Sequence, residues 1–348
     1  MNKNITIRDV AKYAGVSTAT VSYTLNGVKK VSQETKEKVM QAVQELGYQP
    51  DFTAISLSKK KSNLIGIMFP LVGDSLSALM KENPYHTELL SGIEMVAREN
   101  NFDILITGLS KIEECKSWIN KRNLDGLVLL GLFPKKLYNQ LKELDIPTVL
   151  IDTYEDYTNI YPSVNINDEL GGYLGTKHLI ELGHENIAFV AKDIRNNPVE
   201  KKRYQGYQRA LKEAKIRVDR NLIFESQLSQ SRKSTFESGF IIGERILKSE
   251  VGITAIFSMS DILAIGIMKA LNNNCMEVPG DFSLVGFDDI SLSSFIIPGL
   301  TTVKQDISYK GKVAADTLIE AIDESELTAK KIELNVELVV RDSTKVKN

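Results

Sequence analysis

Residues 16–23, which read VSTATVSY, constrain the fold of this chain more than any other stretch. They follow a segment in which Ile7, Val10, Ala11 and Ala14 recur at helical spacing and would form one apolar face two turns long. The residues within 16–23 are mostly small, as a second helix requires if its neighbour crosses it closely. The pattern therefore predicts two short helices packed against each other.

Capping residues indicate where these helices begin and end. Thr6 begins an approximate capping box, and Gly15 can take the left-handed conformation that ends a helix. Ser17 is a candidate N-cap for the second helix, and Ser32 begins a third helix whose stop signal is Gly47. Three short helices around one small core form the helix-turn-helix arrangement.

The second helix of such a module lies in the major groove of DNA, which would leave Thr18, Ala19 and Tyr23 near base edges. Neighbouring polar side chains would then reach phosphates. The alternative is an ordinary helical subdomain, because two helices joined by a glycine turn occur widely. The residues of this module that we expect at the DNA are Thr6, Ser17, Thr18, Ala19, Thr20, Ser22, Tyr23 and Asn26.

The charge distribution favours DNA binding. Residues 1–62 contain ten Lys and Arg against five Asp and Glu, whereas residues 63–348 contain 33 against 40. The two parts therefore carry +5 and −7, which sum to the formal net charge of −2. A basic module joined to an acidic remainder confines the attraction for phosphates to one end of the chain.

The sequence TIRDVAKYAGVSTATVS at residues 6–22 resembles the headpiece of the LacI/GalR family of bacterial transcription regulators, as do LNG at 25–27 and VS at 31–32. Further family patterns continue almost to the C-terminus. The resemblance implies a headpiece at residues 1–49, a hinge helix and linker at 50–62, and a sensor core with the periplasmic-binding-protein fold. It also implies a homodimer that binds a pseudo-palindromic operator in double-stranded DNA.

The resemblance assigns a role to one apolar residue of the hinge. By position, Leu57 corresponds to the leucine that the family wedges into a minor-groove step, with Ala54 beside it. Three lysines follow at 59–61, and an apolar side chain such as Leu57 otherwise has little reason to stand beside them. A plain linker with a surface leucine is the alternative. Ile55 departs from the arginine that the family often has.

The remainder of the chain alternates apolar strands with helical segments, which is typical of buried parallel sheets. Its length allows two more domains, so we expect an α/β sensor core of two doubly wound lobes. The resemblance implies that the chain crosses between the lobes near residues 164, 304 and 332. The lobes would then comprise 63–164 with 304–331 and 165–303 with 332–348.

Ligands of doubly wound sheets bind at the carboxyl ends of strands, which for two lobes is the cleft between them. The guanidinium of Arg203 suits vicinal hydroxyls or a carboxylate, and Asp288 can accept hydrogen bonds from sugar hydroxyls. The resemblance implies that both contact a small-molecule effector. Asp152 and Ser260 follow other strands and are further candidates. Alternatively, these residues cap helices or pair between lobes, and we expect Asp261 to be a helix cap.

An insertion at about residues 71–82 separates the first expected strand from the sequence NPY that begins at Asn83. The family commonly continues from this strand almost at once with Asn-Pro-Phe. Because loops after a first strand line the cleft, Asp74, Tyr85 and His86 are candidate effector contacts. The alternative is that the insertion only decorates the surface.

The sequence lacks catalytic and cofactor motifs. Its three histidines are not spaced as a zinc pair, its glycines form no dinucleotide fingerprint or P-loop, and GGYLG at 171–175 would serve close helix packing. We therefore expect no enzyme, no metal and no cofactor. A carbohydrate-processing enzyme would need an acid and base pair in the cleft, and a pure sugar-binding protein would need an export signal and no headpiece.

Several features predict where the protein acts and how it assembles. The two cysteines are too few for a disulfide framework, no apolar run approaches the ~18 residues of a membrane span, and the polar start lacks a signal-peptide core. We expect a cytoplasmic homodimer, since little chain follows Leu338 to form a leucine-heptad tail. We therefore predict a repressor whose operator affinity is controlled by a sugar or sugar phosphate bound between the lobes.

We predict that Leu57→Ala lowers affinity for operator DNA and leaves effector binding unchanged, because only the DNA-bound hinge would use this side chain. An electrophoretic mobility shift at a stated salt concentration measures the first quantity, and calorimetry measures the second. Unchanged operator affinity would contradict the role as a wedge.

Overall fold

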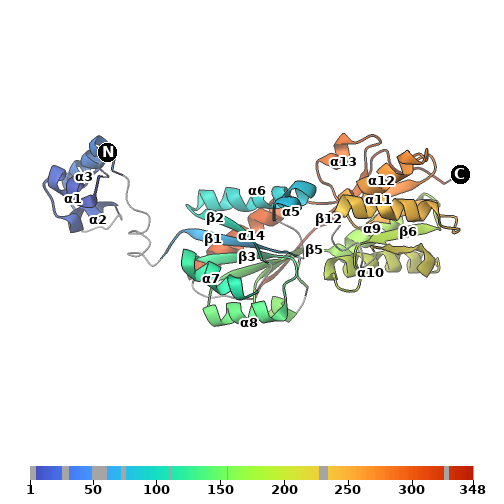
Figure 1. Cartoon of the computed structure of the whole chain (residues 1–348), viewed down its shortest axis with the longest axis horizontal. Coiled ribbons are helices and arrows are strands. Elements are labelled where there is room, and N and C mark those ends of the chain that lie inside the picture. Colours follow the sequence, from blue (N-terminus) through green and yellow to red (C-terminus); the bar gives the residue numbers. More distant parts are fainter. Residues whose placement is uncertain are drawn as a thin grey trace. The chain divides into compact units, whose positions relative to one another are not determined.

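The computed structural model describes residues 5–25, 31–48, 61–71, 76–109, 112–154, 156–226, 234–324 and 329–347. The chain divides into two units, Met1–Ser62 and Asn63–Asn348. Figure 1 shows the first unit as a cluster of helices and the second as two α/β lobes. Within the described residues, no helix is both long and apolar enough to cross a membrane.

The first unit contains the three helices that the sequence predicted. They are α1 (Ile7–Ala14), α2 (Thr18–Leu25) and α3 (Gln33–Leu46). The helices enclose one small core in which Val10, Val21 and Val39 are fully buried, and Leu25 packs against it. The prediction of a helix-turn-helix headpiece from apolar spacing is confirmed.

Local hydrogen bonds determine where α1 and α2 begin. The backbone N–H of Thr6 donates to the Asp9 carboxylate at 2.9 Å, and Gly15 ends α1 with a φ of 67°. The Ser17 hydroxyl accepts from the backbone N–H of Thr20 at 3.1 Å, which is the geometry of an N-cap. The turn between the two helices therefore follows from short-range contacts within the sequence.

The N-terminal lobe of the second unit is a six-stranded parallel sheet covered by helices on both faces. Its elements are β1 (Leu64–Pro70), α5 (Leu76–Glu82), α6 (Pro84–Glu99), β2 (Asp103–Leu109), α7 (Ile112–Arg122), β3 (Gly126–Leu130), α8 (Lys135–Leu144), β4 (Thr148–Ile151), the 3-10 turn η1 (Asp156–Asn159), β5 (Ser163–Ile166), α14 (Ile307–Glu324) and β11 (Lys331–Leu334). The strand order is β11-β5-β4-β3-β1-β2. Helices α6 and α14 pack on one face and α7 and α8 on the other. Alternate side chains of a strand point to opposite faces, and here both faces carry buried apolar side chains that the helices cover.

The C-terminal lobe repeats this architecture with the strand order β12-β10-β9-β8-β6-β7 and one antiparallel pair, β10 with β12. Its elements are α9 (Asp168–Glu181), β6 (Ile187–Ala191), α10 (Pro198–Glu213), the 3-10 turn η2 (Arg220–Leu222), β7 (Ile223–Glu225), α11 (Thr235–Leu247), β8 (Ala255–Ser258), α12 (Asp261–Asn273), β9 (Ser283–Asp288), α13 (Leu292–Phe295), β10 (Thr301–Gln305) and β12 (Val336–Val339). Helices α9 and α10 cover one face, and α11 and α12 cover the other. The prediction of two doubly wound lobes is confirmed.

The chain passes between the lobes three times. Strand β5 is followed by α9, β10 by α14, and β11 by β12, with a single residue, 167, 306 or 335, between the elements of each pair. The resemblance implied crossings near residues 164, 304 and 332, which lie inside β5, β10 and β11 and within three residues of the observed crossings. The apolar pattern continues to the end of a strand and does not mark where the chain changes sheet. The predicted boundary between headpiece and hinge, at residues 49–50, lies outside the described residues.

Helices α9 and α10 cross at very short range. A Cβ at Gly172 would lie 2.0 Å from the carbonyl oxygen of Arg203, and a Cβ at Gly206 would lie 2.0 Å from that of Glu169. Only glycine allows this approach. The glycine pattern in α9 therefore serves helix packing, as the sequence predicted, and the packing fixes the backbone that carries Arg203.

We predict that Gly206→Ala lowers the free energy of unfolding by about 1–3 kcal/mol, because the added methyl group forces α9 and α10 apart. Denaturant titration measures this change. Gly252→Ala is the matched control, since the nearest atom there, Asn186 Nδ2, lies at 3.8 Å. Equal stabilities of the two variants would contradict the close crossing.

Candidate functional site: the cavity between the sensor lobes

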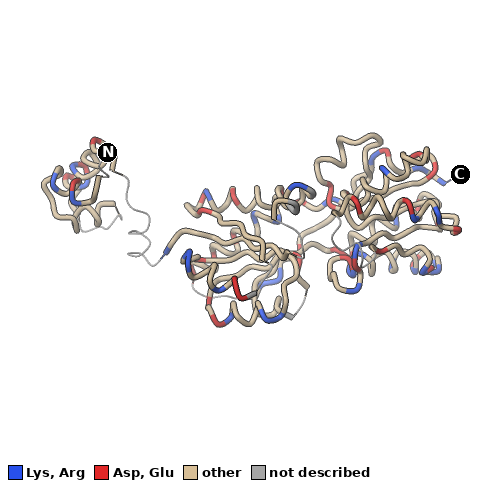
Figure 2. Tube along the Cα trace, viewed as in Figure 1, with Lys and Arg blue, Asp and Glu red and all other residues tan. Residues whose placement is uncertain are grey.

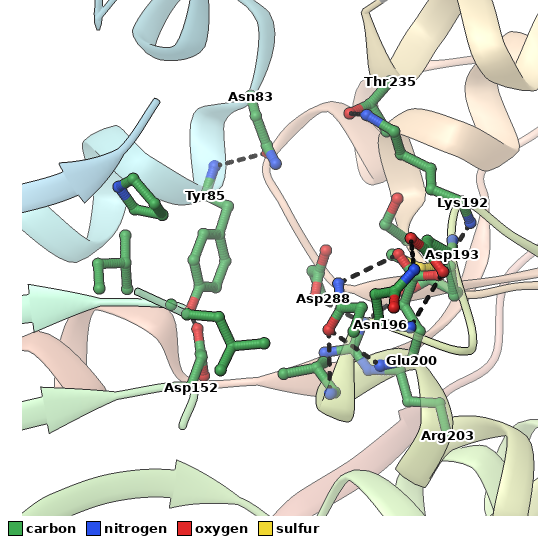
Figure 3. A pocket seen from close by; sticks show the side chains of 18 of the residues that line it. Asn83, Tyr85, Asp152, Lys192, Asp193, Asn196, Glu200, Arg203, Thr235 and Asp288 are labelled. Atoms are coloured by element: carbon green, nitrogen blue, oxygen red, sulfur yellow. Dashed lines mark hydrogen bonds and ion pairs between the residues drawn. The ribbon is translucent and has the colours of Figure 1, made fainter. Parts of the chain in front are cut away.

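A cavity of about 790 Å³ lies between the two lobes. Its walls follow the carboxyl ends of β1, β3 and β4 in the N-terminal lobe and of β6, β8 and β9 in the C-terminal lobe. Figure 3 shows Tyr85 and Asp152 on one side and Lys192, Glu200 and Arg203 on the other. This is where two doubly wound sheets are expected to hold a ligand.

Six of the seven candidate effector contacts line this cavity. The six are Tyr85, His86, Asp152, Arg203, Ser260 and Asp288. The seventh, Asp74, lies outside the described residues. Helix α5, within the insertion, packs Leu76 and Met80 against the apolar core beside α6, and none of its described residues lines the cavity.

Arg203 is a buried cation held by two carboxylates. Its Nε donates to Asp168 at 2.7 Å, and its NH1 lies 3.6 Å from Asp288 Oδ1. The guanidinium also lies 3.5 Å from the ring centroid of Phe287. Burial alone would lower the pKa of Arg203, but the two carboxylates outweigh it and raise this pKa. Arg203 is therefore both a wall of the cavity and a structural ion-pair partner.

Asp288 ends β9 with a φ of 114°, a conformation that costs free energy for a residue with a side chain. Gln305 Nε2 donates to its Oδ1 at 2.7 Å. Burial raises the pKa of Asp288 to about 6, although Arg203 and the Gln305 hydrogen bond favour the carboxylate. Asp288 therefore lies at the carboxyl end of a strand, as the sequence predicted, and its carboxylate is oriented by Gln305.

Ser260 rather than Asp261 is the N-cap of α12, so the expectation that Asp261 caps a helix is wrong. The Ser260 hydroxyl accepts from the backbone N–H of Leu263 at 3.4 Å. Asp261 is fully buried and accepts from the Ser293 and Thr302 hydroxyls. Burial, together with the charge of Asp288, raises the pKa of Asp261 to about 8. Its partners are distant in sequence, which is why a local pattern did not reveal them.

Asp152 forms a cluster with Tyr85 and Lys310 in the N-terminal wall. The Tyr85 hydroxyl donates to Asp152, and Lys310 Nζ lies 2.8 Å from Asp152 Oδ1. Burial opposes ionisation of Asp152, but the Lys310 charge and these hydrogen bonds outweigh it and lower its pKa. Asp152 is therefore a carboxylate at neutral pH.

The rest of the N-terminal wall is largely apolar, with Phe69, Pro70 and Leu130 facing the cavity. The ring of His86 stands edge-on to Phe69 with 5.4 Å between centroids. Its Nδ1 is buried and has no hydrogen-bond partner within the described residues. Burial lowers the pKa of His86 to about 4, so the imidazole is neutral at physiological pH. An apolar wall with one free imidazole nitrogen suits a ligand with both apolar and hydroxyl surfaces.

The loop between β6 and α10 and the first turn of α10 contribute lining residues that the sequence analysis did not identify. The buried carboxylate of Glu200 accepts the backbone N–H groups of Lys192 at 2.9 Å and Asp193 at 2.6 Å. Burial raises the pKa of Glu200 to about 7. The sequence signal that could have located this loop was Asn197 followed by Pro198. These residues are the N-cap and first-turn proline that begin α10 directly after the loop.

The predicted base-contacting residues of the first unit are exposed on α2, and Tyr23 is 48% exposed. Thr20 and Ser22 are half-buried beside them. Figure 2 shows Lys and Arg on α1 and α3, whereas α2 has no charged residue. The other predicted DNA contacts are the exposed Thr6 and Ser17 and three residues outside the described part of the chain, Asn26, Ala54 and Leu57.

We predict that Glu200→Gln removes a pH dependence of stability. The pKa of Glu200 is raised from 4.5 to about 7 in the folded protein, so its contribution is full in acid and is lost as pH rises through this window. The free energy of unfolding of the wild type should therefore fall relative to that of the variant. Denaturant titrations across this range measure both, and parallel curves would contradict the raised pKa.

Within the described residues, no group of three or more His, Cys, Asp or Glu could hold a metal ion. The site is thus a cavity with oriented carboxylates, one buried guanidinium and an apolar wall. These groups can bind and orient a polar ligand by hydrogen bonds.

Two family models match this chain. The model of bacterial regulatory proteins of the lacI family matches residues 6–51, and that of the periplasmic binding protein-like domain matches residues 176–344. The HTH-type transcriptional regulator RegA of Clostridium saccharobutylicum is 33% identical over 343 residues, which cover 97% of this chain and 98% of RegA. The ribose operon repressor of Halalkalibacterium halodurans is 34% identical over 346 residues, with 98% and 97% covered.

Similarity to a solved structure extends over both units. The lac repressor dimer bound to operator and the anti-inducer ONPF matches with a TM-score of 0.82 and 29% identity, covering 99% of this chain and 100% of that chain. The relatives above exceed 30% identity over nearly their whole length. The chain therefore belongs to the LacI family of bacterial transcription regulators.

Proposed function

We propose that this protein is a cytoplasmic repressor that binds a pseudo-palindromic operator as a homodimer and changes its operator affinity when a sugar occupies the cavity between its lobes. The observation that carries this proposal is the combination of an exposed α2 in a basic headpiece with a cavity of oriented carboxylates in the same chain. A DNA-binding domain alone would not respond to metabolites, and a sugar-binding protein alone would not need a headpiece.

The surface of α2 supports sequence-specific DNA contacts. Uncharged side chains on α2 can reach base edges, while Lys and Arg on the flanking helices α1 and α3 can reach phosphates. Tyr23 offers one hydroxyl and a ring that can meet a thymine methyl group. The resemblance to the family implies that arginine often occupies this position, and arginine binds guanine through two hydrogen bonds. We therefore propose that the operator differs from those of arginine-containing relatives at the base pair that Tyr23 meets.

Exposed apolar side chains support the proposed homodimer. Phe295, at the end of α13, is 74% exposed, and Ile297 beside it is 92% exposed. Large apolar side chains that cluster on a surface commonly mark an interface. Two copies related by a two-fold axis would present two headpieces to the two halves of a pseudo-palindrome.

The charge of the cavity supports a neutral sugar over a sugar phosphate. The lining contains five acidic side chains and three basic ones. The basic Arg203 is already paired with Asp168 and Asp288, and the imidazole of His86 is neutral. A phosphate would meet a net negative wall, whereas sugar hydroxyls can donate to the carboxylates. The relative named as a ribose operon repressor also favours a saccharide.

Two measurements test this function. A thermal-shift screen over neutral sugars and sugar phosphates identifies the ligand, because a ligand of the native state raises the melting temperature. An electrophoretic mobility shift with DNA upstream of the chain's own operon then measures operator binding with and without that ligand. We expect a shifted band whose intensity depends on the sugar. Failure to bind any such DNA, with or without metabolites, would contradict the proposal.

We predict that Asp288→Asn weakens sugar binding at least tenfold and leaves operator binding by the sugar-free protein unchanged. A hydrogen bond to a charged group contributes about 1.5–3 kcal/mol, and Asn keeps the shape of the side chain. Arg203 is a poorer choice, because its removal leaves Asp168 buried without a cation. Calorimetry measures the sugar affinity, and Asp316→Asn, on the exposed side of α14, is the control. Equal sugar affinities would contradict the role of Asp288.

A further inference from the structure

Lys310 is a lysine with no exposed surface, located near the start of α14. A lysine this buried is rare unless its charge is paired. Its Nζ donates to Asp152 Oδ1 at 2.8 Å and to the Tyr85 hydroxyl at 3.0 Å. The ammonium also lies 5.3 Å from the centroid of the Tyr85 ring.

This cluster joins three elements behind one wall of the cavity. Tyr85 lies in the first turn of α6, Asp152 follows β4, and Lys310 belongs to α14. Tyr85 and Asp152 line the cavity, whereas Lys310 is not among the lining residues. Figure 3 shows the Tyr85 side chain directed at Asp152. Lys310 therefore acts on the cavity through these two residues.

The hydrogen bonds of Asp152 within the protein determine which hydrogen bonds it can form with a ligand. Oδ1 accepts from Lys310 and Oδ2 accepts from Tyr85, so the orientation of the carboxylate is fixed from behind. Its backbone is held in the left-handed region with a φ of 56°. An ionised carboxylate has further lone pairs and no proton to donate. Asp152 can therefore accept from a ligand hydroxyl and cannot donate to a ligand acceptor.

We propose that Lys310 is a positioning residue for effector binding, which holds Asp152 as a fixed, ionised acceptor in the N-terminal wall of the cavity. The sugar-binding consequence rests on the proposed function, but the effect of Lys310 on the Asp152 carboxyl does not. The apolar neighbours of Asp152 in this wall would otherwise favour the neutral acid.

Other charged and titratable groups act on Asp152 more weakly than Lys310. Arg203 is the other cation that lowers the pKa of Asp152, and it is shared with Asp168 and Asp288. The imidazole of His86 is neutral, so it supplies no charge. The groups that face this site from all packed elements are Tyr85 and His86 from α6, Tyr154 after β4, Arg203 from α10, Asp288 from β9 and Lys310 from α14.

The first test is the titration of Asp152 in the full-length wild type and in Lys310→Met. Carbon-13 NMR of carboxyl-labelled aspartate follows it, and Asp152→Asn assigns the signal. We expect Asp152 to titrate below its ordinary pKa of 3.8 in the wild type and above it in Lys310→Met, because burial is then no longer offset. Lys312→Met, on the same helix and half-buried, should leave the titration unchanged. An unchanged titration in Lys310→Met would overturn the proposal.

A double variant keeps the test informative if Lys310→Met folds poorly. Asp152→Asn with Lys310→Met removes both charges, so no buried carboxylate lacks its cation. We expect this double variant to melt at a higher temperature than Lys310→Met alone. If the single variant is as stable as the wild type, and the double variant gains nothing, Lys310 does not hold an ionised Asp152.

The second test measures sugar affinity by calorimetry, with D-ribose as the first probe, because a relative is named as a ribose operon repressor. Asp288 and Glu200 titrate between about pH 5 and 8 in both proteins, so the ratio of the two sugar affinities is compared at each pH. We expect the affinity of Lys310→Met to fall relative to that of the wild type by about tenfold for each pH unit below the raised pKa of Asp152. A sugar that binds both proteins equally at every pH overturns the positioning role. If no sugar of the wider screen binds the wild type, the proposed function fails instead, and the carboxyl titration decides the role of Lys310.

Discussion

The buried guanidinium of Arg203 is the interaction on which the C-terminal half of the sensor cavity depends. It joins α10 to α9 through Asp168 and to β9 through Asp288, and it covers the ring of Phe287. The glycine-mediated crossing of α9 and α10 allows these elements to meet at the required distance. Breaking a buried pair of this kind costs about 3–5 kcal/mol, because the partner charge is left uncompensated. The same contacts that stabilise the lobe therefore orient the groups that face the ligand.

The N-terminal wall uses the same principle with a different cation, and one crossing segment links the two walls. Gln305, just before the crossing at residue 306, donates to Asp288 in the C-terminal lobe, and Lys310, just after it, donates to Asp152 in the N-terminal lobe. A ligand that contacts both Asp288 and Asp152 would therefore be connected, through Gln305 and Lys310, to the single segment that crosses between the lobes at residue 306. In the proposed function, such a segment would connect ligand binding to the relative positions of the lobes, as hinge segments do in regulators that couple two sites.

Much of this molecule could be predicted from its sequence because the signals are local or periodic. Apolar spacing and caps predicted α1, α2 and α3, a strand-end position singled out Asp288, and the resemblance to the family singled out Arg203, which lies within α10. Lys310 could not be found this way, since a lysine in a helix is normally solvated and its partners Asp152 and Tyr85 lie 158 and 225 residues away. The same reason applies to the buried role of Asp261 and to the residues at which the chain changes sheet. Long-range contacts decide these features, and one sequence read alone does not contain them.

In the proposed function, occupation of the sensor cavity and binding of operator are coupled. Fluorescence anisotropy with a labelled operator, at one fixed salt concentration, measures operator affinity with and without saturating sugar, and calorimetry measures sugar affinity with and without saturating operator. Coupled sites require that both affinities change by the same factor, for which about 5–150-fold is typical. We expect such a reciprocal change in operator affinity and sugar affinity. A sugar that binds free and operator-bound protein with the same affinity would contradict it.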